Sequence, residues 1–403
     1  MRGMPACCRT SLLCSMIRTC MPLCCASMLV LSLVSDVATA DEIGDELATI
    51  ARAGPEGAGS EGARAASTKL ASRGADTLPR LLAAMETENP VAANWARSAY
   101  EVIAERELAK PNRQFPVNDL KSFVRDSKHV GRVRRLALSL CDQLDPGFSK
   151  ALIPKLLQDP EFRQDAVETA LSAGQQALEN GDSETARAEF RQAFEHSRDS
   201  SQTVRAAGKL AGLGENVDIA EHLGLIVDWW LIGPFDAPQF SGFAREFPPE
   251  HGIDLKAEYT GQEGHSLHWV RHRTIDPLGL LNLVQALAPA KEAVGYAFTE
   301  LISPRDQAVQ LRCGADDNCT VWLNGQKVFG RDQWLNGIRL DRFVTPVQLR
   351  GGTNQLLVKI CQGPQHKDPQ VANNWSLQLR FCDENGSGIK LRSALPKIPG
   401  AAQ

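Results

Sequence analysis

The stretch that decides the fold of the C-terminal half is Val321-Trp-Leu-Asn-Gly325. Apolar Val321 and Leu323 alternate with Thr320 and Trp322, which is the period of a half-buried β-strand. Asn-Gly directly after such a run is a strong signal for a two-residue hairpin turn. The stretch therefore predicts a strand and a tight turn, with Trp322 pointing away from the face that Val321 and Leu323 bury.

The same alternation recurs on both sides of this stretch. Apolar residues occupy every second position in three further runs, which are Val309, Leu311 and Cys313; Leu356, Val358 and Ile360; and Leu377, Leu379 and Phe381. The pairs Gly351-Gly352 and Asn385-Gly386 mark further turns. Several short strands at regular spacing predict an all-β antiparallel sandwich of jelly-roll type over residues 226–391. We expect a disordered tail over residues 392–403.

Three motifs follow one another in a characteristic order. They are Gly314-Ala-Asp-Asp317, then Val321-Trp-Leu-Asn-Gly325, and finally Gly351-Gly-Thr-Asn-Gln-Leu-Leu-Val-Lys359. This order resembles the galactose-binding-like and PA14-like sandwich modules of secreted bacterial proteins and glycosidases. The resemblance implies binding of sugar or another polymer, as in some members, and plain structural packing, as in others, because a fold does not determine a function.

Residues 61–225 have a different character, since they are rich in Ala, Leu, Glu, Arg and Gln with helical periodicity. Over residues 61–171, three stretches repeat an apolar cluster, a polar break and a second amphipathic helix, which resembles HEAT repeats and implies an α-solenoid. Residues 172–225 resemble a tetratricopeptide hairpin. Within it, Gly181-Asp-Ser183 predicts a helix cap rather than a hydrolase nucleophile, because no strand precedes it. Residues 41–60 are expected to be a flexible linker.

Residues 1–40 have the pattern of a cleavable signal peptide. Positive charge comes from Arg2, Arg9 and Arg18, residues 28–34 are apolar, and Ala38-Thr-Ala40 supplies small residues before a cleavage point. The apolar run is too short to span a bilayer, and no later segment is long and apolar enough. We therefore expect export to the periplasm or the extracellular medium. A start at Met16 would give the leader a more usual length.

Charge and cysteine content narrow the choice of partner and compartment. A net charge of −4 argues against a nucleic-acid partner, which calls for a basic stripe. Beyond the leader, the cysteines are Cys141, Cys313, Cys319, Cys361 and Cys382. Strand parity predicts two disulfides, 313–319 and 361–382, the second on strands expected to be neighbours. The alternative is five buried free thiols.

Tryptophans and asparagines provide the candidate binding site. Sugar binding uses an exposed aromatic surface with polar groups beside it. The aromatic candidates are Trp322, Trp334 and Trp375, and their polar neighbours are Asn324, Asn336 and Asn374. The alternative is that these tryptophans pack inside the protein. Asp316 and Asp317 are candidate oxygen ligands for a structural Ca²⁺, against the alternative of a solvated turn, and no other cofactor is expected.

No motif in the sequence supports catalysis. The cluster His265, His268 and His272 lies on a predicted strand, where three-ligand metal geometry fails. There is no G-x-S-x-G, no H-E-x-x-H and no phosphate-binding glycine-rich loop. Two hypotheses follow. In the first, a non-enzymatic exported protein binds carbohydrate or another cell-surface polymer through its sandwich, with the repeats as scaffold. In the second, the repeats bind a protein partner and the sandwich is structural.

Overall fold

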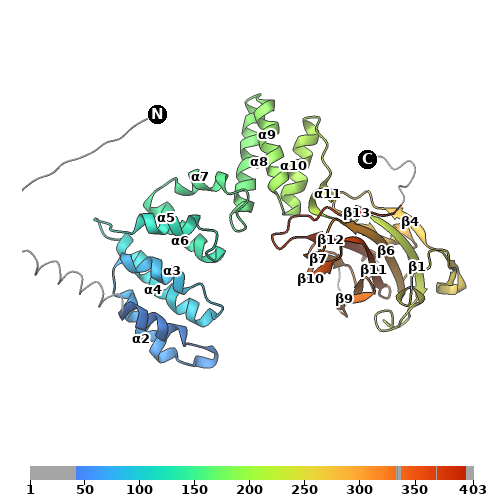
Figure 1. Ribbon diagram of the computed structural model, residues 1–403, viewed down its shortest axis with the longest axis horizontal. Coiled ribbons are helices and arrows are strands. Elements are labelled where there is room, and N and C mark those ends of the chain that lie inside the picture. Colours follow the sequence, from blue (N-terminus) through green and yellow to red (C-terminus); the bar gives the residue numbers. More distant parts are fainter. Residues whose placement is uncertain (1–41, 333, 335–336, 369, 396–403) are drawn as a thin grey trace, which may run out of the picture. The chain divides into compact units, whose positions relative to one another are not determined.

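A computed structural model describes residues 42–332, 334, 337–368 and 370–395 (Figure 1). It confirms the predicted fold class, because a helical segment is followed by an antiparallel β-sandwich. The chain forms two compact units, residues 1–146 and residues 147–403, which are described separately below. The predicted signal peptide lies outside the described residues.

The first unit is entirely helical where it is described. A helix over residues 42–51 is followed by η1 (Pro55–Gly57), α2 (Ser60–Ala71), η2 (Ala75–Thr77), α3 (Leu78–Ala84), α4 (Pro90–Leu108), α5 (Val117–Arg125) and α6 (Gly131–Leu144). Much of the segment expected to be a flexible linker, residues 41–60, therefore has helical structure. Its first helix forms because Ile43 and Ile50 recur at helical spacing and are buried.

The second unit begins with helices that lead into the sandwich. They are α7 (Phe148–Leu152), η3 (Ile153–Lys155), α8 (Arg163–Glu179), α9 (Ser183–His196), α10 (Ser200–Gly212) and α11 (Ile219–Leu223). Figure 1 shows α8, α9 and α10 side by side, in green. Asp182 caps α9 by accepting a hydrogen bond from the Thr185 amide at 3.0 Å, which confirms the predicted cap.

Two sheets form the sandwich. The strands are β1 (Asp228–Asp236), β2 (Tyr259–Thr260), β3 (Ser266–Leu267), β4 (Val270–Arg273), β5 (Leu281–Asn282), β6 (Ala293–Ser303), β7 (Gln307–Ala315), β8 (Cys319–Leu323), β9 (Gln326–Arg331), β10 (Phe343–Leu349), β11 (Gly352–Gln362), β12 (Ser376–Cys382) and β13 (Arg392–Ser393). One sheet has the order β4-β1-β6-β11-β8-β9, with β13 also paired to β6, and the other has the order β10-β7-β12-β5. From β6 onward, the chain passes repeatedly between the sheets.

The core lies between the two sheets and confirms the predicted alternation. The inward residues of β7, β8, β11 and β12 all belong to one buried cluster, which includes Leu311, Val321, Val358 and Leu379. The hairpin turn at Asn324-Gly325 is present, and both residues have positive φ. Part of the expected tail is also ordered, since β13 pairs with β6.

A second apolar cluster covers the outer face of the larger sheet. The excursion between β1 and β4 folds over this face and contributes Phe247, Leu267 and Trp269, which pack against Tyr296 and Phe298 of β6. We call this group the outer cluster. The segment also contains η4 (Pro248–Glu250), η5 (Gln262–Gly264) and the short β2–β3 pair. Both faces of the larger sheet are therefore buried over much of their area.

Helix α11 is fastened to the outer face of the smaller sheet. Arg380 of β12 is 1% exposed and donates hydrogen bonds to the carbonyl oxygens of Leu223 at 3.1 Å and Gly386 at 3.2 Å. Its guanidinium also pairs with Asp341, and Arg312 contacts the same carboxylate at 3.0 Å. A buried ion cluster thus connects the helices to the sandwich within this unit.

Candidate functional site

The candidate site lies where several loops meet at one end of the sandwich. We call this region the loop end and define it by Phe240, Lys291, Glu292, residues 316–318, Trp334 and Gly363. At its surface, Phe240 is 50% exposed, and its ring meets the half-buried Trp334 edge to face, with centroids 4.6 Å apart and an interplanar angle of 73°. Two aromatic rings therefore present an apolar surface to solvent.

The backbone that carries Phe240 is strained. Gln239 and Phe240 have φ of 55° and 61°, and Glu292 has φ of 48°. Each non-glycine residue in this region costs on the order of 1 kcal/mol or more, and such strain persists where the surroundings enforce it, often at functional sites. Here the Glu292 carboxylate accepts a hydrogen bond from the Gln239 amide at 2.7 Å, so the side chain of one strained residue holds the backbone of the other in place.

Hydrogen bonds connect the aromatic pair to the 316–318 turn. The Gly363 amide donates to the Asp317 carboxylate at 2.9 Å, and the Glu292 amide donates to the Gly363 carbonyl at 3.0 Å. The Trp334 ring lies against Gly363, because a β-carbon at that position would be 3.2 Å from the ring. Gly363 is therefore the point at which Trp334 and Asp317 are held together.

The loop end contains positively and negatively charged side chains. Burial lowers the pKa of Lys291, although the carboxylates of Asp317 and Asp316 oppose this effect. Burial also raises the pKa of Asp316, whose carboxylate accepts the Gly337 amide at 2.6 Å. Asn318 is fully buried and donates to Asp332, while its Oδ1 has no hydrogen-bond partner in the described structure. The loop end therefore combines a cation and carboxylates with an apolar surface, and a buried amide oxygen without a partner among the described residues lies within it.

The other predicted site residues are placed elsewhere. Trp322 lies half-buried against the outer cluster, on the face that its parity predicted. Asn324 is part of the hairpin turn, because its side chain donates to Asn354 at 2.9 Å and accepts the Gln355 amide at 3.0 Å. Neither residue joins the loop end through these contacts.

Trp375 corrects one prediction. It is 1% exposed, belongs to the core between the sheets, and donates its indole N–H to the Ile360 carbonyl at 3.2 Å. It is therefore a packing residue rather than a surface aromatic, because it immediately precedes β12 and turns into the core. Asn374 is exposed, and its carbonyl oxygen accepts a hydrogen bond from Gln362. Asn336 lies outside the described residues.

The described residues give no support to a calcium site. Asp316 and Asp317 each accept a backbone amide, and Lys291 lies close enough to interact with both carboxylates. Within the described part of the chain, no group of three or more histidine, cysteine, aspartate or glutamate side chains could hold a metal ion. This finding covers the cluster at His265, His268 and His272. None of the described helices is long and apolar enough to cross a membrane.

The cysteine pairing at 361–382 is also corrected. Cys361 lies on β11 of the larger sheet and packs in the outer cluster, whereas Cys382 lies on β12 of the smaller sheet. These strands are not neighbours, so the two side chains cannot meet as paired strands would allow. The five cysteines within the described residues are free thiols and are buried.

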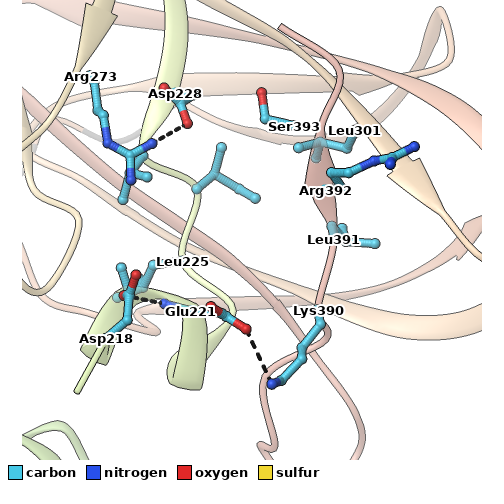
Figure 2. A pocket seen from close by; sticks show the side chains of 13 residues that line it. Asp218, Glu221, Leu225, Asp228, Arg273, Leu301, Lys390, Leu391, Arg392 and Ser393 are labelled. Carbon is cyan, nitrogen blue, oxygen red and sulfur yellow. Dashed lines mark hydrogen bonds and ion pairs between the residues drawn. The ribbon is translucent and has the colours of Figure 1, made fainter. Parts of the chain in front are cut away.

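A separate cavity of about 390 Å³ lies where α11 and the start of β1 approach the C-terminal strand (Figure 2). Its charged lining is largely paired already. Arg273 binds Asp228 at 2.5 Å, Lys390 binds Glu221 at 3.2 Å, and Asp218 caps α11 by accepting the Glu221 amide at 2.8 Å (Figure 2). These contacts fasten elements of the second unit to one another, so we place the candidate site at the loop end instead.

Sequence reasoning missed Phe240, Lys291 and Gly363. These residues lie in irregular loops, where no periodicity separates an exposed aromatic from a buried one. Their proximity follows from strand order, because β1, β6, β8 and β11 are neighbours in the larger sheet and each of these loops flanks one of those strands.

The fold and the loop end define a helical protein with an antiparallel β-sandwich whose loops present aromatic and polar side chains. No protein-family profile matches the chain, and no curated protein matches it. Among solved structures, similarity extends to a GH2 beta-galacturonidase from Eisenbergiella tayi, with 8% identity and a TM-score of 0.22, over 39% of this chain and 25% of that one. It also extends to the Ruminococcus gnavus beta-glucuronidase, with 14% identity and a TM-score of 0.23, over 40% of this chain and 28% of that one.

A third similar structure is a family 35 carbohydrate binding module from Clostridium thermocellum, with 16% identity and a TM-score of 0.15, over 23% of this chain and 73% of the module. The chain spans only about a quarter of the length of the two glycosidases. Similarities this low carry no argument about the function of the chain.

Proposed function

We propose that this chain is an exported, non-catalytic binding protein whose sandwich binds carbohydrate or another cell-surface polymer at the loop end, with the helices as scaffold. The observation that carries the proposal is the contact between the rings of Phe240 and Trp334, in which Phe240 is half-exposed and lies on a strained backbone. A sugar ring presents an apolar face and a rim of hydroxyls, so it fits an aromatic surface with polar groups beside it.

Packing alone does not account for this arrangement. A loop that served only to cover the core would bury Phe240, yet half of its surface faces solvent at the cost of two residues with positive φ. The Lys291 ammonium interacts with the Asp317 carboxylate, which also accepts the Gly363 amide beside Trp334. Both charged groups are suited to sugar hydroxyls, which donate and accept hydrogen bonds.

A glycan array tests the proposal. The full chain is applied to immobilised plant, algal and bacterial polysaccharides beside two variants, Phe240→Ala and Ile275→Ala. Ile275 is a matched control because it is 97% exposed and follows Arg273, which pairs with the opposite end of β1. The proposal expects binding by the native chain and by Ile275→Ala, with loss in Phe240→Ala. Absence of binding to every glycan by the native chain would contradict it.

Export is tested separately. We expect protein recovered from the periplasm or the medium to begin at Asp41, as shown by N-terminal sequencing. Recovery of the chain only from the cytoplasm, with residues 1–40 retained, would overturn this part of the proposal.

A further inference from the structure

Two cysteines face each other across the core of the sandwich. Cys313 is an inward residue near the end of β7 in the smaller sheet, and Cys319 begins β8 in the larger sheet. Both are at most 1% exposed and belong to the cluster between the sheets. The Cys313 side chain lies near enough to Cys319 to raise the pKa of the Cys319 thiol.

We propose that Cys313 and Cys319 form a disulfide that joins the two sheets and locks the intervening segment, residues 314–318, which contains the 316–318 turn. A disulfide requires two β-carbons that approach closely with their sulfur atoms directed at each other. Both side chains point into the same buried cluster from facing sheets, and only five residues connect them. The sequence prediction of this disulfide relied on side chains that share a face of paired strands. In the structure β7 and β8 belong to different sheets and are not paired. The bond is a cross-link through the core.

The chemistry is thiol–disulfide exchange. One thiol loses its proton and attacks a disulfide of an oxidant such as oxidised glutathione, which forms a mixed disulfide and releases one thiolate. The second cysteine then attacks the mixed disulfide, so the protein S–S bond forms and the oxidant leaves as two reduced thiols. The two electrons pass from the protein to the oxidant, and the two protons lost by the protein thiols end on the two thiols that leave.

The reaction belongs to folding rather than to the folded state. The hydrogen bond from Cys313, together with burial, raises the pKa of Cys319 well above its usual value, so the reactive thiolate is scarce once the sheets have closed. Within the second unit, Cys361 faces the outer cluster, and Cys382 is not part of the core cluster that contains Cys313 and Cys319. A single bond between residues 313 and 319 is therefore expected.

The locked turn is the one that supports the loop end. The Asp316 amide donates to the Ser376 carbonyl at 3.1 Å, and Asp317 holds Gly363 beneath Trp334. The proposal concerns the bond and the rigidity of this turn, and it does not depend on which ligand the loop end binds.

Peptide mapping tests the bond directly. The full chain is refolded with oxidised and reduced glutathione, denatured, alkylated without reduction and digested with trypsin. Cleavage after Arg312 and Lys327 places both cysteines in one peptide, 313–327, while Cys361 and Cys382 fall in peptides 360–367 and 381–390. We expect peptide 313–327 without alkyl groups and lighter by two hydrogens than its reduced form, and the other two peptides alkylated. Two alkyl groups on peptide 313–327, or its linkage to another peptide, would overturn the proposal.

Amide hydrogen exchange tests the rigidity. Exchange of the amides in residues 314–318 is compared between the oxidised chain, the reduced chain and Cys319→Ser. We expect exchange at least about tenfold faster in the reduced chain and in the variant, because the turn opens locally more often without the cross-link. Equal exchange in all three would overturn the locking of the turn. Residues 200–212 of α10 serve as the internal reference.

Discussion

The ammonium group of Lys359 lies 2.8 Å from Oε1 of Glu250, beneath the segment that covers the larger sheet. The two side chains are only 2% and 11% exposed. The same carboxylate oxygen accepts the Tyr296 hydroxyl at 2.5 Å and the Phe247 amide at 3.2 Å, and the ammonium also donates to the Arg245 carbonyl at 2.5 Å. One ion pair thus fastens the covering segment to the sheet.

Replacing this lysine should destabilise the sandwich. Lys359→Met removes one partner of a buried pair and leaves the Glu250 carboxylate without its cation, which typically costs about 3–5 kcal/mol. Urea unfolding followed by tryptophan fluorescence measures the loss in the free energy of unfolding. The matched control is Lys256→Met in the same segment, which is exposed and should change it by less than about 0.5 kcal/mol. A similar small loss in both variants would show that the pair is not structural.

This lysine also marks the limit of what the sequence could predict about the fold. Alternation along residues 356–360 predicted which side chains face the core, and the structure confirms it. The same alternation placed Lys359 on the outer side, where a charged residue is usually solvated, and gave no sign that residues 237–269 fold over it. Such coverage depends on contacts between segments far apart in the chain, which local periodicity does not contain.

Asp341 should make the stability of the sandwich sensitive to acid. Burial by itself would raise its pKa, but hydrogen bonds from Arg380 and Arg312 hold that pKa below the usual value. A carboxyl group whose pKa is lowered by folding stabilises the protein above its unfolded pKa, which is about 3.9, and this stability is lost as the pH falls through the folded pKa.

Asp341→Asn isolates this effect. At neutral pH the variant should be less stable by about 1–3 kcal/mol, because the two guanidinium groups lose a charged acceptor. Between about pH 5 and 3 its free energy of unfolding should fall less steeply than that of the native chain. Identical pH slopes for the two proteins would contradict the assignment.

Two glycines in the helices of the second unit give opposite predictions. A β-carbon at Gly174 of α8 would lie 2.6 Å from the ring of Phe190 on α9, whereas nothing lies within 4 Å of one at Gly208 of α10. Gly174→Ala should destabilise the helices by about 1–3 kcal/mol through overpacking. Gly208→Ala should stabilise them by about 0.5–1 kcal/mol, because alanine favours the helix. Thermal unfolding followed by circular dichroism measures both, and equal effects would refute the close approach of α8 and α9.

Gly363 offers a way to move Trp334 without removing it. A β-carbon there would lie 3.2 Å from the indole ring and 3.3 Å from the Asp317 carboxylate, so one of these neighbours must shift. If the aromatic pair binds the ligand, Gly363→Ala should weaken binding by about tenfold, or about 1.4 kcal/mol, with little change in melting temperature. The control is Gly212→Ala, where a β-carbon meets nothing within 4 Å. Unchanged affinity in Gly363→Ala would separate Trp334 from binding.

The candidate site was less predictable than the fold. Trp334 was predicted as a binding aromatic and Asp316 and Asp317 as calcium ligands, and the structure places all three at the loop end, where the two carboxylates accept backbone amides. Trp375 has the same sequence character but is buried, because it directly precedes a strand whose side chains face the core. Phe240 could not be identified at all, since its exposure depends on the strained backbone at Gln239 and on the hydrogen bond from the Gln239 amide to the Glu292 carboxylate.

Calorimetric titration of a glycan selected on the array tests the central claim most directly. The native chain is compared with Phe240→Ala and with Trp322→Phe, the latter being a control because Trp322 packs on the outer cluster. We predict that Phe240→Ala weakens binding by at least about tenfold, or about 1.4 kcal/mol, while Trp322→Phe binds as the native chain does. Equal affinity of the native chain and Phe240→Ala would contradict the assignment of binding to the loop end.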